Sequence, residues 1–197
     1  MANNENTWDK LLQIKTTGRD DSSADQYRYP YEPTPYSVLE RLADSGYITD
    51  ENVLIDYGCG KGRAGIFLSY RTGCSATGIE FDSSLYTCAK ENHKNCPNEK
   101  RLTFVLVNSE AYDVGTDADA FYFFNPFSIK VLQSVIGKIR DSWYQRPREL
   151  TLYFYYPSDE YVTYLMTVPE LGFLDEIDCS DLFEGENPRE RILIFEM

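Results

Sequence analysis

The sequence predicts an α/β fold with a seven-stranded, mostly parallel sheet, an antiparallel last strand, and helices on both faces. Three observations predict it. Short, nearly continuous apolar runs alternate with helical patterns from about residue 53 onward, as in parallel sheets covered on both sides. A glycine-rich loop follows the first of these runs. No helical pattern separates the last two runs, so we expect a hairpin there that makes the final strand antiparallel.

The chain is expected to divide into a mobile or helical N-terminal lead, residues 1–26, and a single domain, residues 27–197, without internal repeats. In the lead, one short helix is indicated by the apolar positions Trp8, Leu11, Leu12 and Ile14. Three prolines keep residues 27–36 extended. Thr34 and Pro35 are then expected as the N-cap and first residue of a helix that stops near Gly46.

Each later element is bounded by turn residues. We expect strands at 53–57, 75–81, 102–107, 120–125, 150–156, 173–179 and 191–196. Helices are expected at 63–70, at 84–95, from 128 onward and at 159–167, each connecting two strands.

The bulk composition excludes several classes of protein. The net charge of −13 repels phosphate backbones and favours cationic partners. No apolar run is long enough to cross a bilayer, and the polar N-terminus lacks the features of a secretion signal. Five scattered cysteines without a CxxC pair indicate reduced thiols and a cytoplasmic protein. With His93 as the single histidine, we expect no metal site.

The loop after the first strand reads Asp56-Tyr57-Gly58-Cys59-Gly60-Lys61-Gly62. Gly58, Gly60 and Gly62 let the backbone turn sharply and approach a ligand without a Cβ in the way. Gly60, Gly62 and Gly65 also satisfy the GxGxxG pattern of dinucleotide sites. Two points argue against NAD: the strand already ends at Tyr57, and Asp56 places a carboxylate where a pyrophosphate would lie.

Glu80 ends the second strand, where an acidic side chain can accept hydrogen bonds from both ribose hydroxyls. Together, the spacing Asp56-x-Gly58-x-Gly60-x-Gly62 and Glu80 resemble motif I and the ribose acid of class I S-adenosylmethionine-dependent methyltransferases. The resemblance implies their Rossmann-like sheet and S-adenosylmethionine as the cofactor, a phosphate-free cation that suits an acidic loop. It also implies that Glu110 lies near the adenine amino group and that Ala111 supplies a backbone N–H.

The fourth strand leads into Asn125-Pro126-Phe127, which resembles the Asn-Pro-Pro-Tyr/Phe motif of amino-group methyltransferases without its second proline. The resemblance favours a nitrogen acceptor and makes these three residues the candidate catalytic group. The amide oxygen of Asn125 can accept an N–H hydrogen bond and orient the nitrogen lone pair. Phe127 can stack on a planar group or line a slot for an alkylamine.

The segment Tyr31-Glu32-Pro33-Thr34-Pro35 is similar to the Thr-Pro element that precedes motif I in nitrogen methyltransferases. It also resembles a Tyr-x-Pro-Thr-Pro stretch of protein-lysine methyltransferases, which implies that Tyr31 and Thr34 border the methionine part of the cofactor. Aromatic faces can hold a cation, but tyrosines are also ordinary strand residues. The tyrosines concerned are Tyr27, Tyr29, Tyr31, Tyr36, Tyr155 and Tyr156.

The sequence therefore predicts a cytoplasmic S-adenosylmethionine-dependent methyltransferase that acts on a nitrogen of a protein or small molecule. One alternative is a nucleic-acid base methyltransferase, opposed by the acidic charge and by the lack of a separate target-recognition domain. A second is a non-catalytic module that binds the cofactor as a sensor or scaffold. A third, an NAD-dependent oxidoreductase, is disfavoured by Asp56. The acceptor and the oligomeric state stay open.

Overall fold

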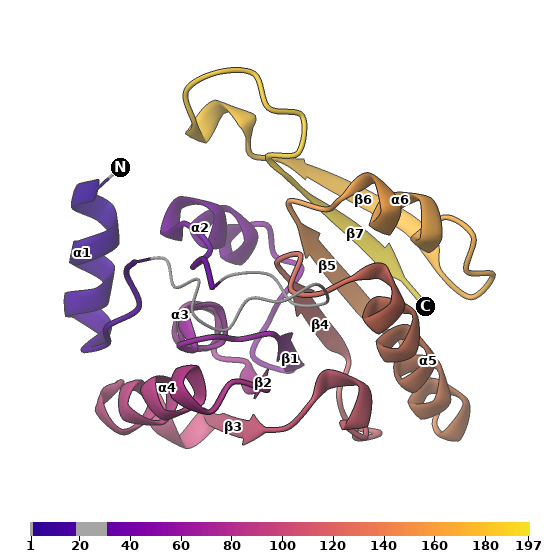
Figure 1. The fold of residues 1–197 in the computed structure, drawn as a ribbon, viewed down its shortest axis with the longest axis horizontal. Helices are drawn as coiled ribbons and strands as arrows, with labels where there is room; N and C mark the ends of the chain where they lie inside the picture. The colour runs from indigo at the N-terminus through magenta and orange to yellow at the C-terminus, as the bar shows by residue number, and fades with distance from the viewer. Residues whose placement is uncertain (1, 19–30) are drawn as a thin grey trace.

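The computed structural model describes residues 2–18 and 31–197, which form one mixed sheet with helices on both faces (Figure 1). Every strand expected from the sequence is present. Their bounds are β1 Val53–Tyr57, β2 Ser75–Glu80, β3 Leu102–Leu106, β4 Ala120–Phe123, β5 Thr151–Tyr155, β6 Gly172–Asp178 and β7 Arg191–Glu196.

The strand order is β3-β2-β1-β4-β5-β7-β6. The first five strands are parallel, while β7 runs antiparallel to both β5 and β6. This confirms the predicted fold, including the antiparallel last strand. The chain moves outward in opposite directions on the two sides of β1 and β4, so the crevice at their carboxyl ends is where such sheets bind ligands.

Side chains that alternate along the strands build two separate cores. One core lies under α2, α3 and α4 and includes Leu54 and Tyr122, whereas the other lies under α5 and α6 and includes Ile55 and Phe123. The α-helices are α1 Ala2–Leu12, α2 Tyr36–Asp44, α3 Arg63–Thr72, α4 Ser83–Asn95, α5 Ile129–Gln145 and α6 Asp159–Leu165. Single-turn 3₁₀ helices are η1 Glu99–Arg101, η2 Ser109–Ala111 and η3 Ser180–Leu182.

The helix expected in the N-terminal lead is present as α1, at the outer edge of the α2–α3 layer (Figure 1). Trp8 packs edge-on against Phe67 of α3, with ring centroids 4.9 Å apart. Leu12 and Ile14 are buried in the same core as α2 and α3. The expected extended segment at 27–30, with Tyr27 and Tyr29, lies outside the described residues.

Several boundaries differ by one or two residues from the predicted ones, and three of the differences have a local cause. β4 ends at Phe123 because Asn125 adopts a left-handed backbone with φ 42°. β5 ends at Tyr155 because Tyr156 does the same with φ 52°. α2 begins at Tyr36 with Pro35 in the cap position and no side-chain cap, because the Thr34 hydroxyl is used in a tertiary hydrogen bond described below.

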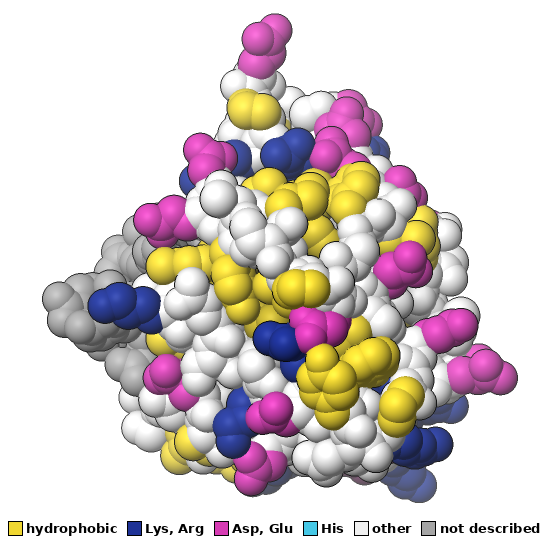
Figure 2. All heavy atoms as spheres, turned by 90° about the vertical axis from the view of Figure 1, so that its right-hand side faces the viewer, with side chains coloured by type: hydrophobic (Ala, Val, Ile, Leu, Met, Phe, Trp, Pro, Cys, Tyr) yellow, Lys and Arg dark blue, Asp and Glu magenta, His cyan; other side chains and the backbone are white. Residues whose placement is uncertain are grey.

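Figure 2 shows the face on the α5, α6 and β6 side, where apolar side chains lie among both basic and acidic ones. The net charge of −13 is therefore not spread as a uniform acidic layer over this face. Within the described part of the chain, no helix combines the length and apolar character that a membrane crossing requires.

Candidate functional site

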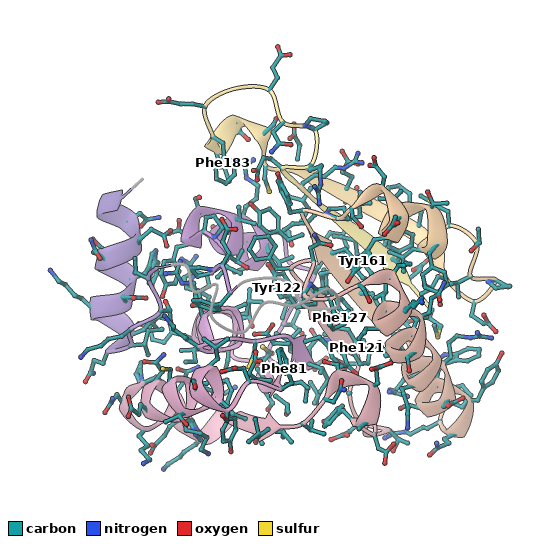
Figure 3. The ribbon with its side chains drawn as sticks, viewed as in Figure 1. Phe81, Phe121, Tyr122, Phe127, Tyr161 and Phe183 are labelled. Carbon is teal, nitrogen blue, oxygen red and sulfur yellow. The ribbon has the colours of Figure 1, made fainter. Side chains whose placement is uncertain are left out.

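A cavity that is partly open to solvent lies at the carboxyl ends of β1, β2 and β4. Nine of the predicted site residues line it: Tyr31, Thr34, Asp56, Gly58, Gly60, Glu80, Asn125, Pro126 and Phe127. Figure 3 shows Tyr122 and Phe127 near the centre of the molecule and Phe81 close to the end of β2. These segments, far apart in the sequence, therefore meet where the sheet's strand order changes direction.

Two buried carboxylates hold the glycine loop in place. Asp56 Oδ2 accepts a hydrogen bond from the Gly65 N–H at 3.1 Å, in the first turn of α3. Glu80 Oε2 accepts from the Gly60 N–H at 2.9 Å, while its Oε1 accepts from the N–H groups of Phe81 and Asp82. Burial raises the pKa of Glu80 against the effect of these donors. The two carboxylates that hold the loop thus also line the cavity.

Asp56 makes the stability of the protein depend on pH. Burial raises the pKa of Asp56 to about 7; the Gly65 N–H opposes the shift and the nearby Glu80 adds to it. The folded-state pKa exceeds the ordinary value of 3.8, so the folded state holds the Asp56 proton more tightly than the unfolded chain does. The stability that Asp56 contributes in this way is complete below about pH 4 and is lost as pH rises through about 7. We expect the ligand-free wild type to lose stability relative to Asp56→Asn across this window.

Denaturant unfolding of both proteins from pH 4.5 to 7.5 measures this difference. Asparagine does not titrate, and the pH-dependent contributions of the other groups, which the two proteins share, cancel in the difference between their unfolding free energies. A difference in unfolding free energy that stays constant over the window contradicts the assignment to Asp56.

The glycine loop is closely covered by other chain segments. A Cβ on Gly60 would lie 2.3 Å from the Tyr31 ring, and a Cβ on Gly58 would lie 2.5 Å from Pro126 Cβ. Both glycines have positive φ, 55° and 70°. The Tyr31 hydroxyl donates to the Thr16 carbonyl at 2.7 Å, and the Lys61 ammonium lies 4.7 Å from the ring centroid. The predicted site segments at 31 and 126 therefore pack directly on the loop.

Thr34 is held by the sheet. Its hydroxyl shares a 2.9 Å hydrogen bond with the hydroxyl of Tyr122, a buried residue of β4 that also lines the cavity. The Thr34 carbonyl accepts a hydrogen bond from Arg63 at 3.1 Å. This arrangement explains why Thr34 does not cap α2, as the sequence had predicted, and instead forms part of the cavity wall.

Arg63, the first residue of α3, joins the N-terminal region to the cavity. Its side chain is 2% exposed and forms ion pairs with Glu5 and Asp9. Its Nε donates to Thr16 Oγ1 at 2.7 Å. Burial alone would raise the pKa of Asp9, but hydrogen bonds from Thr16 and Tyr36 and the Arg63 charge hold it below its ordinary value. The N-terminal helix is thus tied to the start of α3 by buried charges.

Arg63→Met is expected to lower the free energy of unfolding by about 3–5 kcal/mol, because it leaves Asp9 buried without its cation. The matched control is Arg71→Met, because Arg71 also lies in α3 but pairs with the exposed Asp44. This substitution is expected to lower the free energy of unfolding by about 0–1 kcal/mol. Chemical denaturation measures both; equal losses for the two variants would show that Arg63 has no special role.

The β4 tip carries the candidate catalytic residues. Asn125 Oδ1 is buried and has no hydrogen-bond partner among the described residues. Phe127 is largely a core residue, 4% exposed and edge-on to Phe123, with part of its surface at the cavity. Phe124 also lines the cavity and lies edge-on to Tyr156. Left-handed backbone at Asn125 and Tyr156 is costly and clusters at functional sites.

Tyr156 is fixed by the connection between β6 and β7. Asn187 Nδ2 donates to its hydroxyl at 3.0 Å, and the Arg189 guanidinium lies 4.3 Å from its ring centroid. The neighbouring Tyr155 hydroxyl donates to Glu190 at 2.7 Å. These aromatic side chains form a rigid wall beside Phe124 and the β4 tip.

Three predicted site residues do not line the cavity. Gly62 is the N-cap of α3, and a Cβ there would meet the Phe104 ring at 2.7 Å, so its role is packing against β3. Glu110 and Ala111 are exposed on η2, whereas Asn108 and Ser109 line the cavity. Asn108 also caps η2 by accepting from the Glu110 N–H, and the base-binding role of Glu110 and Ala111 stays a prediction.

Sequence reasoning did not identify Arg63, Tyr122 or Tyr57 as cavity residues. Arg63 directly follows the glycine loop, and an arginine there was indistinguishable from a solvated helix residue. Tyr122 and Tyr57 lie in apolar strands, where a tyrosine is ordinary.

Comparison of the sequence with protein-family models and with curated proteins gives no match. Among solved structures, the chain is similar to an RNA methyltransferase from Salinibacter ruber in complex with S-adenosyl-L-homocysteine. The two share 21% identity and a TM-score of 0.53, over 84% of this chain and 92% of that one. The glycopeptide N-methyltransferase MtfA with S-adenosylmethionine has 11% identity and a TM-score of 0.62, over 81% and 86%.

A TehB-like S-adenosylmethionine-dependent methyltransferase from Corynebacterium glutamicum has 17% identity and a TM-score of 0.55, over 98% of this chain and 96% of that one. At these identities, the likeness establishes a shared fold. The chain therefore has the Rossmann-like fold of class I S-adenosylmethionine-dependent methyltransferases.

Proposed function

We propose that this protein is an S-adenosylmethionine-dependent methyltransferase whose acceptor is a nitrogen atom of a protein or small molecule. The fold supports the proposal, since the similar structures include an RNA methyltransferase with bound S-adenosyl-L-homocysteine and a glycopeptide N-methyltransferase with bound S-adenosylmethionine. The cofactor, when bound, supplies an electrophilic methyl group on a positively charged sulfur.

The observation that carries the proposal is the pairing of the glycine loop with two carboxylates. In a dinucleotide site, the N–H groups at the start of the helix face a pyrophosphate. Here the Gly65 N–H donates to Asp56 and the Gly60 N–H donates to Glu80. A pyrophosphate would have to displace a carboxylate and lie beside the other, whereas a cationic ligand without phosphate is attracted to both.

The cavity has two chemically different ends that fit the two parts of the cofactor. The end at the α3 face is polar, with Thr34, Asp56 and Arg63, and suits the charged amino-acid part. The lining residues on the α5 face, Ile79, Phe127 and Val131, are apolar and suit a flat base. Glu80 also lines the cavity, and its oxygens can accept hydrogen bonds from ribose hydroxyls.

Asn125 supports a nitrogen acceptor. Its buried Oδ1 is without a partner among the described residues and can accept an N–H hydrogen bond from an acceptor in the cavity. Such a bond would orient the nitrogen lone pair, which is the main requirement of an in-line transfer. Pro126 and Phe127 hold this tip against Gly58 and Phe123.

The charges near the cavity favour a cationic protein or small molecule. The cavity is lined by Glu32, Asp56 and Glu80, while its arginine, Arg63, is already paired with Glu5 and Asp9. The connection between β6 and β7 adds Glu184 and Glu186, both exposed. This excess of acid attracts cations at long range.

A nucleic-acid base methyltransferase is the second candidate, favoured by the Asn125-Pro126-Phe127 segment and by the RNA methyltransferase among the similar structures. Arg140, Arg146 and Arg148 lie close together in the sequence but do not support it. Arg146 and Arg148 donate to the carbonyls of Thr116 and Ala118, just before the amino end of β4 and opposite the cavity. Arg189, in the connection between β6 and β7, has its guanidinium positioned over the Tyr156 ring.

Calorimetry with S-adenosylhomocysteine and NAD tests the cofactor, and we expect binding of the first alone. Transfer of labelled methyl from S-adenosylmethionine into fractionated cell extract tests the acceptor class, with label expected in protein or small molecules. Label in RNA or DNA would favour the second candidate. Binding without transfer to any fraction would favour a non-catalytic module. The five free thiols support a reducing compartment such as the cytoplasm.

A further inference from the structure

Tyr57, the last residue of β1, has a buried hydroxyl that the fold itself does not use. The side chain is 1% exposed, and its hydroxyl has no hydrogen-bond partner among the described residues. A buried, unpaired hydroxyl costs folding free energy and is rare in native proteins. Tyr57 also lines the cavity. A ligand bound in the cavity can therefore supply the partner that the hydroxyl lacks.

The Tyr57 ring is rigidly placed. It stacks on Phe123 of β4 with centroids 5.1 Å apart and an interplanar angle of 4°, and Phe123 stacks in turn on Phe154 of β5 at 4.6 Å and 6°. Tyr112, which follows η2, lies edge-on at 6.4 Å. These contacts restrict the ring to one orientation on the α5 side of the sheet, so the hydroxyl position is fixed before any ligand binds.

The surroundings of Tyr57 belong to the apolar end of the cavity. Its register partner on β2 is Ile79, which lines the cavity with Phe127 and Val131 on the same α5-facing side. Burial raises the pKa of the Tyr57 hydroxyl well above its ordinary value, so the group stays protonated and offers a hydrogen-bond donor. An apolar slot with one fixed donor suits a heteroaromatic base with ring nitrogens as acceptors.

The two residues that the resemblance places near the base lie outside the cavity lining. Glu110 and Ala111 are exposed and do not line the cavity, and Asn108 Oδ1 already accepts from the Glu110 N–H at 3.3 Å. Ser109 lines the cavity near the same end. At the apolar end of the cavity, the Tyr57 hydroxyl is buried and has no hydrogen-bond partner among the described residues.

We propose that the Tyr57 hydroxyl is a base-recognition group that donates a hydrogen bond to a ring nitrogen of the bound purine. This inference rests on the proposed function, because it assigns the purine of that cofactor to the apolar end of the cavity. Tyr57 then contributes to the selection of the cofactor, in addition to packing in the core beneath α5.

Tyr57→Phe removes the hydroxyl and keeps the ring. We expect S-adenosylhomocysteine to bind about three- to tenfold more weakly by calorimetry, as for the loss of one neutral hydrogen bond. The unfolding temperature of the ligand-free variant should be unchanged or higher, because a buried unpaired group has been removed. Tyr153→Phe is the matched control: its hydroxyl donates to the Tyr47 carbonyl outside the cavity, so its loss should spare ligand affinity.

Three analogues of S-adenosylhomocysteine, with carbon in place of purine nitrogen 1, 3 or 7, identify the acceptor atom. With one of them, wild type and Tyr57→Phe should bind equally, since the hydrogen bond is already missing. An unchanged affinity of Tyr57→Phe for S-adenosylhomocysteine overturns the inference while the proposed function stands. The inference is also overturned if Tyr57→Phe binds each of the three analogues more weakly than the wild type does, by the same factor. Failure of the wild type to bind S-adenosylhomocysteine overturns both.

Discussion

Gly60→Val is expected to reduce S-adenosylhomocysteine binding by at least about 100-fold, below detection by calorimetry at ordinary protein concentrations. A Cβ at this position would already lie 2.3 Å from the Tyr31 ring, and valine adds two methyl groups at a φ of 55°. The Tyr31 hydroxyl is bound to the Thr16 carbonyl, so the ring has little freedom to move away. The loop and its covering segment would be forced apart where the ligand must fit.

Gly46→Val is the matched control for the backbone effect. Gly46 also has positive φ, 83°, but an added Cβ meets no atom within 4 Å, and the residue does not line the cavity. It should lose stability and keep its ligand affinity. Circular dichroism melting identifies variants that fail to fold, in which case Gly60→Ala provides the milder change. Unaltered binding by a folded Gly60 variant would show that the loop does not hold the cofactor.

Asn125→Ala is expected to lower the rate of methyl transfer by about 100-fold or more, the loss typical of one well-placed polar group in an active site, and to leave S-adenosylhomocysteine affinity within about threefold. The amide oxygen is buried and unpaired among the described residues, so its removal leaves no protein donor unsatisfied. Transfer of labelled methyl into the accepting extract fraction measures the rate, and calorimetry measures the affinity.

The backbone of Asn125 complicates this substitution, because φ of 42° is costlier for alanine than for asparagine. Asn125→Gly resolves the two effects, since glycine accepts this backbone but lacks the amide. If the amide orients the acceptor, Asn125→Gly should be as stable as the wild type and as slow as Asn125→Ala. A glycine variant with normal turnover would instead make Asn125 a turn residue without a part in transfer.

The strands were predictable because each is a short apolar run between turn residues. Predicted and observed limits of β1 and β7 agree, and those of the other five strands differ by one or two residues. The differences at β4 and β5 have a common cause. Asn125 and Tyr156 adopt a left-handed backbone, although both residue types can also occur in a strand. The side chain of Tyr156 is held by Asn187 and Arg189, which lie about 30 residues away in the sequence.

The candidate site was predictable where a residue type is unusual for its position. Asp56 within an apolar strand, Glu80 at a strand end and three alternate glycines carry such a signal, and the structure brings Asp56, Gly58, Gly60 and Glu80 to one cavity. Gly62 has the same spacing but packs against Phe104. A glycine required by a ligand and one required by a neighbouring ring are identical in sequence.

By itself, the sequence determined the order and type of the elements, and with them the sheet and the edge at which its loops meet. These properties follow from local periodicity and from the geometry of parallel strands. Only the tertiary structure decided which side chains reach the cavity. Arg63 enters it because Glu5 and Asp9 neutralise a buried cation from a distant helix, and Tyr57 does so because Phe123 fixes its ring. Such placements depend on charge pairing and packing between remote segments, for which a single sequence carries no periodic signal.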